Sequence, residues 1–293
     1  MTSFPVSIQN FLYDKDVDLH TIDSLYGVNS GRGVFAFRVY SKKNSFIVKK
    51  CIQKREFDVY TKHSAFFKEH NINIPDIFVS YTENGDHWIV IEDIPNKFPE
   101  SRWKADFEQI RFLYQLHSKS LDKSIDLDDP FVYMYKEETI QKANKILPLE
   151  LSIRLNALQT QFQQLFEPFC IISGDPNPTN WGIKVNGDLV LFDFERIGFG
   201  NPAIDLAITI PGVGSKDGSL EKEIAVSYIT LWQENGLKYP FSVNELIVQI
   251  HRAKLWITLD FLTNNYETLS KRSLDYFVAG VIEKMKRFID IIG

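Results

Sequence analysis

The most informative stretch of the sequence is Ser173-Gly174-Asp175-Pro176-Asn177-Pro178-Thr179-Asn180, and it is followed by Asp193-Phe194-Glu195. A short apolar run precedes each of these two motifs, at residues 170–172 and 189–192. Short apolar runs bounded by Gly, Asn, Asp and Pro are typical of buried strands that end in loops. The pattern therefore predicts that the polar side chains of both motifs lie in loops at strand ends.

Phosphoryl transfer from a nucleotide needs the kinds of side chain that these two motifs provide. One carboxylate accepts the proton of the acceptor hydroxyl, while an Asn oxygen and a second carboxylate hold Mg²⁺ against the phosphates. Asp, Asn and Pro are also common turn formers, so any one of them alone would indicate only a loop. The combination at this spacing, with an apolar run before each carboxylate, favours a functional site.

The sequence up to residue 94 is dominated by strand patterns. Apolar residues alternate or cluster at 34–39, 46–49 and 87–91, whereas they recur at helical spacing across 54–69. Pro75 then restarts extended chain. The expected order is strand, strand, helix, strand, strand.

A different pattern follows the two-proline segment 95–99, which we take as the boundary between two domains, 1–94 and 95–293. Apolar residues recur every three or four positions in 107–117, 246–261 and 274–288, which predicts amphipathic helices. The second domain is therefore expected to be mainly helical, and the chain as a whole to be an α+β protein.

Composition indicates a globular chain that needs no disulfide framework. The 293 residues are 44% hydrophobic and 24% charged, and two cysteines far apart, Cys51 and Cys170, favour a reducing, cytoplasmic compartment. The sequence has no signal-peptide pattern at its N-terminus and no apolar stretch long enough to span a membrane. A net charge of −5 without a long basic run argues against a nucleic-acid partner. The sequence leaves open whether the chain is a monomer or a homodimer.

Three segments, in this order, resemble the aminoglycoside phosphotransferase and choline kinase superfamily: Gly174-Asp175-x4-Asn180, Asp193-Phe194-Glu195 and Gly200-Asn201-Pro202-Ala203-Ile204-Asp205-Leu206-Ala207. The third segment resembles the aminoglycoside phosphotransferase branch more closely. With weaker marks elsewhere, the similarity covers about residues 24 to 290. It implies a protein-kinase-like bilobal fold, with an N-terminal antiparallel sheet plus helix and a larger, mainly helical C-terminal lobe. It also implies a small-molecule kinase that uses ATP, or GTP, with Mg²⁺.

The resemblance assigns roles to the polar residues of the two motifs. Asp175 matches the catalytic base. Asn180 matches a metal ligand, and Asp193 matches the metal ligand that begins the Asp-Phe-Gly motif of kinases. The resemblance therefore makes residues 174–195 the expected centre of the reaction.

Lys49, at the end of the run Phe46-Ile47-Val48, matches the lysine that contacts the α- and β-phosphates. Neighbouring strand residues face opposite ways, so at most one of Lys49 and Lys50 can reach the phosphates. We favour Lys49 because the Val-Ala-Ile-Lys pattern ends there. Its expected ion-pair partner on the following helix is Glu56, with Asp58 as the competing acid.

Two further segments are expected to meet the nucleotide. In 27–33, Ser30, Gly31 and Gly33 would let backbone N–H groups approach the triphosphate, although an ordinary hairpin turn explains this segment equally well. Segment 91–94 resembles the superfamily's hinge, where backbone groups, here those of Glu92 and Ile94, bind the adenine edge.

Three residues near the motifs are expected to act mainly through structure. His117 matches the histidine of a lobe-packing helix, and Asp205 would accept hydrogen bonds from the loop that carries Asp175. Ser173 stands where the superfamily usually has His, and its hydroxyl makes one local hydrogen bond but cannot fill the same volume. This departure keeps open an alternative, a catalytically degenerate nucleotide-binding regulator.

The acceptor is expected to be a hydroxylated small molecule, namely an amino sugar, another sugar or an amino alcohol. A polycationic aminoglycoside would need a cleft dense in acids. The chain after residue 94 carries 22 basic and 26 acidic residues, and its acidic cluster at 126–129 also fits an exposed loop. Choline would want an aromatic cage, and the candidates for one are Trp181, Trp232, Trp256 and Tyr266. A protein kinase is disfavoured because Gly174, rather than Arg, stands directly before Asp175 and no Ala-Pro-Glu segment follows Asp193.

Overall fold

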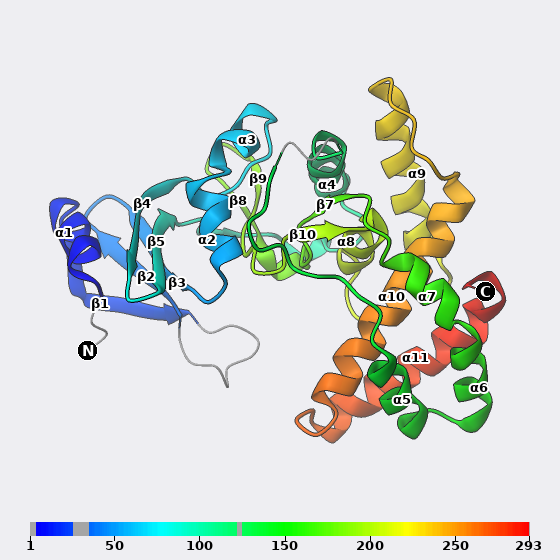
Figure 1. The fold of residues 1–293 in the computed structure, drawn as a ribbon. Helices are drawn as coiled ribbons and strands as arrows, with labels where there is room; N and C mark the ends of the chain where they lie inside the picture. Colours follow the sequence, from blue (N-terminus) through cyan, green and yellow to red (C-terminus); the bar gives the residue numbers. More distant parts are fainter. Residues whose placement is uncertain (1–3, 26–34, 122–124, 293) are drawn as a thin grey trace. The chain divides into compact units, whose positions relative to one another are not determined.

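The computed structural model describes residues 4–25, 35–121 and 125–292 (Figure 1). By their contacts the residues form two compact units. The first contains residues 1–97, 125–131 and 180–197, and the second contains 98–124, 132–179 and 198–293. The predicted α+β class with an antiparallel N-terminal sheet is confirmed. Residues 180–197, which follow the expected domain boundary by more than 80 positions, belong to the first unit by their contacts.

The first unit is built on a five-stranded antiparallel sheet in the order β1-β2-β3-β5-β4. The strands are β1 (Val17–Leu25), β2 (Ala36–Ser41), β3 (Ser45–Cys51), β4 (Ile77–Glu83) and β5 (Asp86–Glu92). Side chains alternate between the two faces of a strand, so Phe37, Val39, Phe46 and Val48 share one face. That face is buried against Phe4, Ile8 and Leu12.

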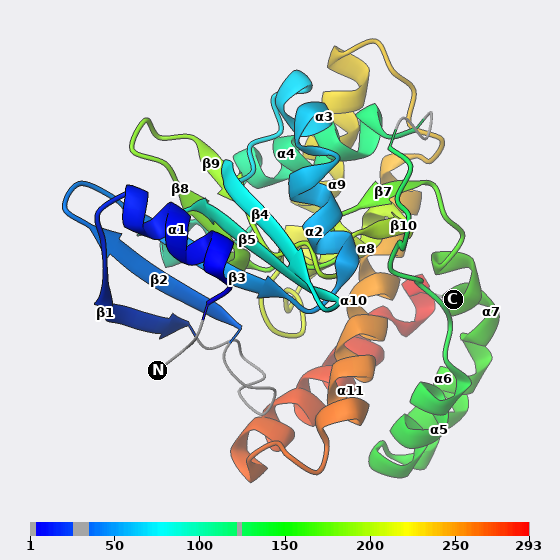
Figure 2. The same ribbon diagram turned by 60° about the vertical axis from the view of Figure 1, so that its left-hand side comes forward.

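Helix α1 (Val6–Asp14) supplies that cover, and Figure 2 shows it lying across the sheet. The sequence patterns did not indicate α1, because the helix is short and Pro5 at its N-cap position provides no side-chain cap. Ile8 and Leu12, four positions apart, nevertheless lie on one helix face and are fully buried. Tertiary packing rather than local propensity therefore stabilises α1.

The helix predicted over 54–69 is divided in two, α2 (Lys54–Thr61) and α3 (Ser64–Glu69). The N–H groups of Lys62 and His63 both donate to the carbonyl of Asp58, at 2.8 and 3.1 Å. One carbonyl thus closes the end of α2 through both donors, and the chain turns before α3 begins.

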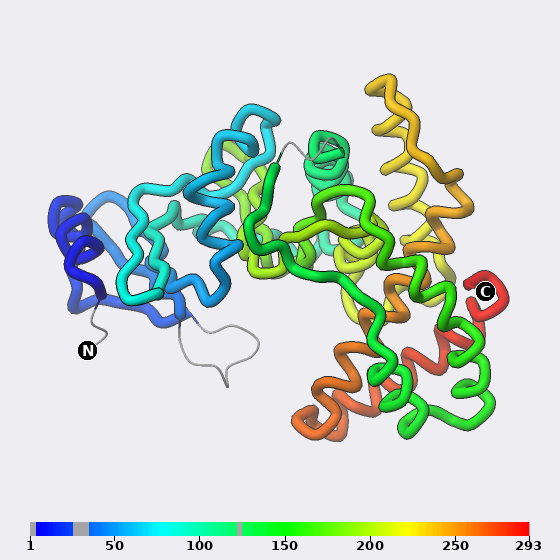
Figure 3. Tube along the Cα trace, viewed as in Figure 1, coloured from blue at the N-terminus to red at the C-terminus, as the bar shows by residue number. Residues whose placement is uncertain are grey.

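A second, three-stranded sheet, β6-β8-β9, belongs to the same unit. It consists of β6 (Asn96–Lys97), β8 (Trp181–Ile183) and β9 (Leu189–Leu191). Figure 3 shows this late segment returning beside α2 and α3. The ring of Phe194 lies 6.1 Å from that of Tyr60 and 5.6 Å from that of Phe67. Packing against α2 and α3 therefore fixes where the Asp193 motif lies.

The second unit is mainly helical, as expected. Its helices are the 3₁₀ turn η2 (Glu100–Arg102), α4 (Phe107–Lys119), α5 (Glu137–Ile146), α6 (Leu149–Ala157), α7 (Gln159–Leu165), α8 (Pro202–Ile208), α9 (Ser219–Glu234), α10 (Val243–Asn265) and α11 (Lys271–Ile292). Strands β7 (Cys170–Ile172) and β10 (Gly198–Gly200) pair antiparallel, and the 3₁₀ turn η3 (Pro178–Asn180) leads into β8. Helix α10 packs against α5, α7, α8, α9 and α11 and forms the centre of this unit (Figure 1).

Among the described residues, no helix combines the length and the apolar character that crossing a membrane requires.

Replacing Leu12 by Ala should destabilise the protein by about 2 to 5 kcal/mol, because it leaves a cavity between α1 and the sheet. The matched control is Tyr13→Ala on the same helix, where the side chain is 82% exposed. We expect that change to stay within about 0.5 kcal/mol. Urea unfolding followed by circular dichroism measures both, and equal effects would contradict the packing described for α1.

Candidate active site

Lys49 is at the centre of the site in the first unit. Val48 faces α1, so the next residue on β3 projects from the other face of the sheet. There the Lys49 Nζ lies 2.7 Å from Glu56 Oε1, 3.3 Å from Asp193 Oδ1 and 3.7 Å from Glu195 Oε1. One ammonium thus joins strand β3, helix α2 and the segment after β9.

The two alternatives considered for this ion pair have other partners. Lys50 projects from the opposite face, where its Nζ lies 2.7 Å from Asp86 Oδ2 and 5.9 Å from the Trp88 ring. Asp58 accepts a hydrogen bond from Lys54 at 2.7 Å and lies 3.4 Å from Lys62. The expected pairing of Lys49 with Glu56 is therefore present in the structure.

Burial and charge shift the pKa of both partners. Burial opposes the charged form of Lys49, but the neighbouring carboxylates of Glu56, Asp193 and Glu195 outweigh it and raise the lysine pKa well above its ordinary value. Burial raises the pKa of Glu56 to about 7, and the attraction of Lys49 limits this rise. The Glu56 side chain is 1% exposed, so its charged form depends on the lysine.

Asn180 and Asp193 lie at the same end of one hairpin. Trp181 at the start of β8 pairs with Leu191 at the end of β9, and the N–H of Phe192 donates to the Asn180 carbonyl at 3.0 Å. The ladder thus extends one step beyond the two strands and holds both residues at the hairpin's open end. Asp193 has a φ of 71°, in the left-handed region that non-glycine residues seldom adopt.

Glu195 is a site residue to which the sequence patterns assigned no role. Single carboxylate oxygens of Glu56, Asp193 and Glu195 lie within 4.8 Å of one another, a spacing that a metal ion could bridge. The Asp193-Phe194-Glu195 triplet could have indicated Glu195, because one apolar residue separates its two acids. That residue, Phe194, is buried in the structure. Residues of this kind, two apart in a turn, can face the same partner.

The loop before Asp175 is held by Asp205 in the second unit. Asp205 is fully buried in α8 and accepts hydrogen bonds from Ser173 N at 2.8 Å, Ser173 Oγ at 3.0 Å and Gly174 N at 2.8 Å. Asp175 itself is half-buried, and its Oδ1 accepts a hydrogen bond from Asn177 Nδ2 at 2.8 Å. The serine in place of the usual histidine therefore still bonds to the anchoring carboxylate.

His117 completes this network from helix α4. Its ring is fully buried, with Nε2 3.2 Å from Asp205 Oδ2 and Nδ1 2.9 Å from the hydroxyl of Tyr228 on α9. The buried carboxylate of Asp205 is therefore surrounded by hydrogen-bond partners from the loop and from α4. Such a fully bonded network holds a loop in one position.

Residues 91–94, the segment expected to meet the adenine edge, lie at the end of β5. The N–H of Glu92 donates to Asp76 O at 2.8 Å, and the Glu92 carboxylate lies 2.7 Å from Lys184 Nζ. The Ile94 side chain lies against Gly182, where an added Cβ would come within 2.5 Å of it. The side chains of Glu92 and Ile94 are thus engaged in the fold. Ser30, Gly31 and Gly33 lie outside the described residues.

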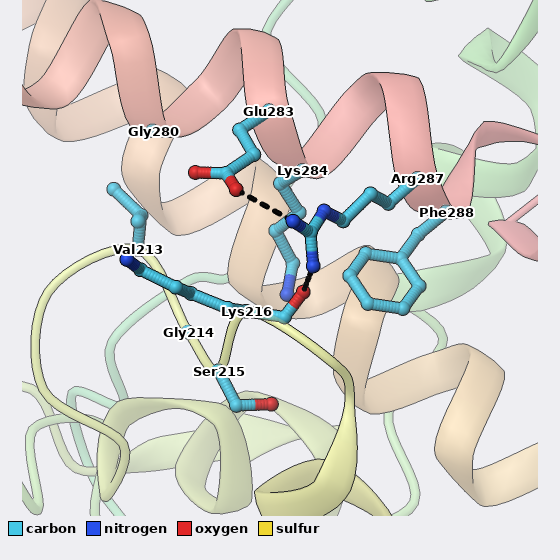
Figure 4. Close-up of a pocket in the computed structure, with 9 residues that line it drawn as sticks. All are labelled: Val213, Gly214, Ser215, Lys216, Gly280, Glu283, Lys284, Arg287 and Phe288. Carbon is cyan, nitrogen blue, oxygen red and sulfur yellow. Dashed lines mark hydrogen bonds and ion pairs between the residues drawn. The ribbon is translucent and has the colours of Figure 1, made fainter.

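The three tryptophans considered for an aromatic cage belong to the core. Trp181, Trp232 and Trp256 are at most 5% exposed, as is usual for core tryptophans, whereas Tyr266 is 45% exposed. Figure 4 shows a pocket between residues 213–216 and α11, in which Arg287 bonds to Glu283 and to the carbonyl of Lys216. Its volume of about 20 Å³ suits a water molecule rather than a substrate.

Replacing Lys49 by Met should make stability more strongly pH-dependent. Glu56 then lacks its cation and stays protonated in the folded protein, while the unfolded chain ionises near the ordinary pKa of 4.5. The folded K49M protein then keeps this proton to a higher pH than the wild type, in which Glu56 ionises near pH 7. We therefore expect the free energy of unfolding to fall more steeply than in the wild type as the pH rises above about 7.

Chemical denaturation at several pH values measures this slope. The double variant K49M/E56Q should have a flatter slope than K49M, and Lys50→Met should behave as the wild type. A slope in K49M equal to that of the wild type would contradict the coupling of Lys49 to Glu56.

Solved structures similar to this chain have kinase-like folds. One is the GDP complex of a mutant aminoglycoside 2'-phosphotransferase-IIIa, with a TM-score of 0.65 and 10% identity over 98% of this chain and 99% of that chain. Another is choline kinase LicA from Streptococcus pneumoniae, with a TM-score of 0.58 and 14% identity over 96% and 98%. A third is the gentamicin complex of APH(2″)-IIa, with a TM-score of 0.54 and 16% identity over 100% and 99%.

Of the two sequence comparisons, the one with family models agrees with these likenesses. No match was found among curated protein sequences. The family model of the phosphotransferase enzyme family matches residues 30–234, which is more than half of the chain and includes the three segments that carry the resemblance. The resemblance to the aminoglycoside phosphotransferase and choline kinase superfamily is thereby confirmed. The chain belongs to the phosphotransferase enzyme family.

Proposed function

We propose that this phosphotransferase is a small-molecule kinase that transfers the γ-phosphoryl group of ATP, or of GTP, to a hydroxyl group. The observation that carries the proposal is the cluster in which Lys49 Nζ lies within 3.7 Å of Glu56, Asp193 and Glu195. A lysine that is both charged and held by carboxylates from a helix and a loop is ready to meet phosphate oxygens.

Lys49 would bind the α- and β-phosphates, and Glu56 would hold its ammonium in place. Backbone groups of Ser30, Gly31 and Gly33 would approach the triphosphate, and those of Glu92 and Ile94 would meet the base. In this proposal residues 1–94 are the nucleotide-binding lobe, and residues 95–293 provide catalysis and acceptor binding.

Asn180 and Asp193 would hold Mg²⁺. The donor set fits this ion, because both side chains provide hard oxygen ligands and the hairpin presents them from the same end. When bound, Mg²⁺ would neutralise negative charge on the phosphate oxygens. Asp193 fits this role further because its carboxylate is 40% exposed although it lies near Lys49.

Asp175 would accept the proton of the acceptor hydroxyl. The hydrogen bonds from Ser173 and Gly174 to Asp205 support this role, because they restrain the backbone directly before Asp175. They also weaken one ground for a degenerate regulator, namely Ser173. The other ground, the unusual glycine segment 27–33, lies outside the described residues. The serine keeps a hydrogen bond to the carboxylate that organises the loop.

The proposed acceptors are an amino sugar, another sugar or an amino alcohol, and the proposed location is the cytoplasm. The similar structures named above include an enzyme of aminoglycosides and a choline kinase, which span two of these chemical classes. A screen of ATP consumption against aminoglycosides, sugars and choline-like alcohols, with mass spectrometry of the products, tests the proposal. ATP binding without any phosphorylated product would favour the regulator.

Asp175→Asn should keep the fold and the affinity for Mg-ATP but lower kcat by at least about a hundredfold. This factor is the lower end of the range by which general-base catalysis usually accelerates a reaction. Asp193→Ala should instead weaken Mg-ATP binding. Initial rates and isothermal titration calorimetry distinguish the two effects. Asp188→Asn in the β8–β9 turn is a matched control, because its carboxylate bonds only locally to Asn186 in the described contacts. Near wild-type turnover of the Asp175 variant would refute its role as the base.

A further inference from the structure

Helix α2 is joined to a distant segment of the chain, residues 125–131, within the first unit. This segment has no regular secondary structure, but Ile125 and Leu127 are buried and hold it in place. Its acidic residues therefore have defined neighbours. Asp128 Oδ2 pairs with Lys62 Nζ and lies 3.3 Å from Lys54 Nζ, so it contacts two lysines of the α2 region.

Arg55 makes the more specific contacts to this segment. Its Nε donates to the carbonyl of Asp129 at 2.8 Å, its Nη2 donates to Asp129 Oδ2 at 3.0 Å and its Nη1 donates to the carbonyl of Glu195 at 3.2 Å. The guanidinium carbon also lies 5.6 Å from the centre of the Phe131 ring. We call this group of Arg55, Asp129, Phe131 and the Glu195 carbonyl the Arg55 clamp.

The Arg55 clamp connects the two segments that carry the carboxylates of the site, namely helix α2 and the turn after Asp193. Arg55 directly precedes Glu56 on α2, and Glu195 is two residues beyond Asp193. A single planar side chain therefore sets how the start of α2 lies relative to the turn that follows Asp193. The N–H of Phe131 donates to Ile197 O at 2.8 Å, and Arg196 lies 5.7 Å from the Phe131 ring, so segment 125–131 also holds the far side of that turn.

Asp193 needs such support because of its backbone conformation. A left-handed φ in a non-glycine residue is strained and persists only where the surroundings enforce it. The Phe194 ring, packed near Tyr60 and Phe67, fixes one side of the turn. The guanidinium of Arg55 holds the carbonyl of Glu195, the residue that follows Phe194.

We propose that Arg55 is a positioning residue for phosphoryl transfer, and that Asp129 orients it. In this role Asp129 holds α2 against the Asp193 turn rather than binding a cationic acceptor. This inference rests on the proposed function, because it takes Lys49, Glu56 and Asp193 as the groups that meet the Mg-nucleotide. It also requires arginine, because an ammonium cannot present three donors in one plane to three acceptors.

The ion pairs of Lys54 and Lys62 differ from those of Arg55 in what they contact. Lys54 and Lys62 are 43% and 47% exposed and contact Asp58 or Asp128 but not the Asp193 turn. The Lys62–Asp128 pair is exposed on both sides, and such pairs contribute little to stability. The buried carboxylate of Asp58 keeps its hydrogen bond from Lys54 when Lys62 is replaced. Lys62→Met is therefore a matched control, because it removes a cation that contacts the same segment without loosening the turn.

The test measures nucleotide and acceptor kinetics for Arg55→Met, Arg55→Lys and Lys62→Met. For Arg55→Met we expect kcat/KM for Mg-ATP to fall about tenfold, which corresponds to the loss of hydrogen bonds worth about 1.4 kcal/mol. The acceptor KM and the melting temperature should stay near the wild-type values. Arg55→Lys should recover less than half of the lost activity on a logarithmic scale, and Lys62→Met should equal the wild type.

Hydrogen exchange of the amides in 193–197, measured without nucleotide, provides a second readout. Arg55→Met should speed their exchange, and Lys62→Met should not. If Arg55→Met matches Lys62→Met in both kinetics and exchange, or if its loss of activity only follows a lower melting temperature, the inference is wrong.

A double-mutant cycle of Arg55→Met and Asp129→Ala tests the role of Asp129. The two changes should be clearly less than additive in kcat/KM, and additive effects would show that Asp129 does not act through Arg55. Failure of the proposed function has a different signature. The wild type would then transfer phosphate to no acceptor, while the exchange of 193–197 would still report whether the clamp holds the turn.

Discussion

The attraction between one ammonium and three carboxylates is the constraint on which the candidate site depends. Glu56, Asp193 and Glu195 would repel one another at these distances if Lys49 did not lie between them. Because Glu56 is almost fully buried, it cannot exchange its partner for water. The sheet, helix α2 and the β8–β9 hairpin must therefore pack so that all four charges meet. The single ammonium does not offset all three carboxylates, so the cluster keeps an excess of acidic groups that would favour a cation such as Mg²⁺.

The second unit also contains a buried carboxylate, Asp205, that needs polar partners. This buried carboxylate is stabilised by two backbone N–H groups and a hydroxyl, with the His117 ring beside it. Each unit thus uses a buried charge to position one of the two motifs. A charge buried with all its partners holds a loop more firmly than apolar packing does, because every displaced bond exposes an unsatisfied group.

Many elements of the fold and many candidate site residues could be predicted where the evidence is a pattern of neighbouring residues in the sequence. Period two in β3 predicted that at most one of Lys49 and Lys50 reaches the site, and the family resemblance selected Lys49. The motif spacing identified Asp175, Asn180 and Asp193 as candidate site residues. Helix α1 was missed because its buried face depends on the sheet rather than on caps or length. The division of residues 54–69 into α2 and α3 was missed because the helical spacing of apolar residues continues across the break.

Contacts between residues far apart in the sequence could not be predicted from local patterns. Nothing local indicates that Arg55 meets residues 74 and 140 positions away. The acidic run at 126–129 resembled an exposed loop in sequence, and its charges are indeed exposed, yet Asp128 and Asp129 pair with the α2 region. Pairings of this kind depend on the fold of the whole unit.

The most direct measurement is the NMR signal of the Lys49 ammonium, assigned by its loss in a Lys49→Arg variant, followed through a pH titration and then with Mg-ATP. The account predicts that the ammonium stays protonated beyond its ordinary pKa of 10.5 and that its shift changes when the nucleotide binds. A Lys49 that loses its proton below that value, or whose signal does not respond to a nucleotide that binds, would contradict the account.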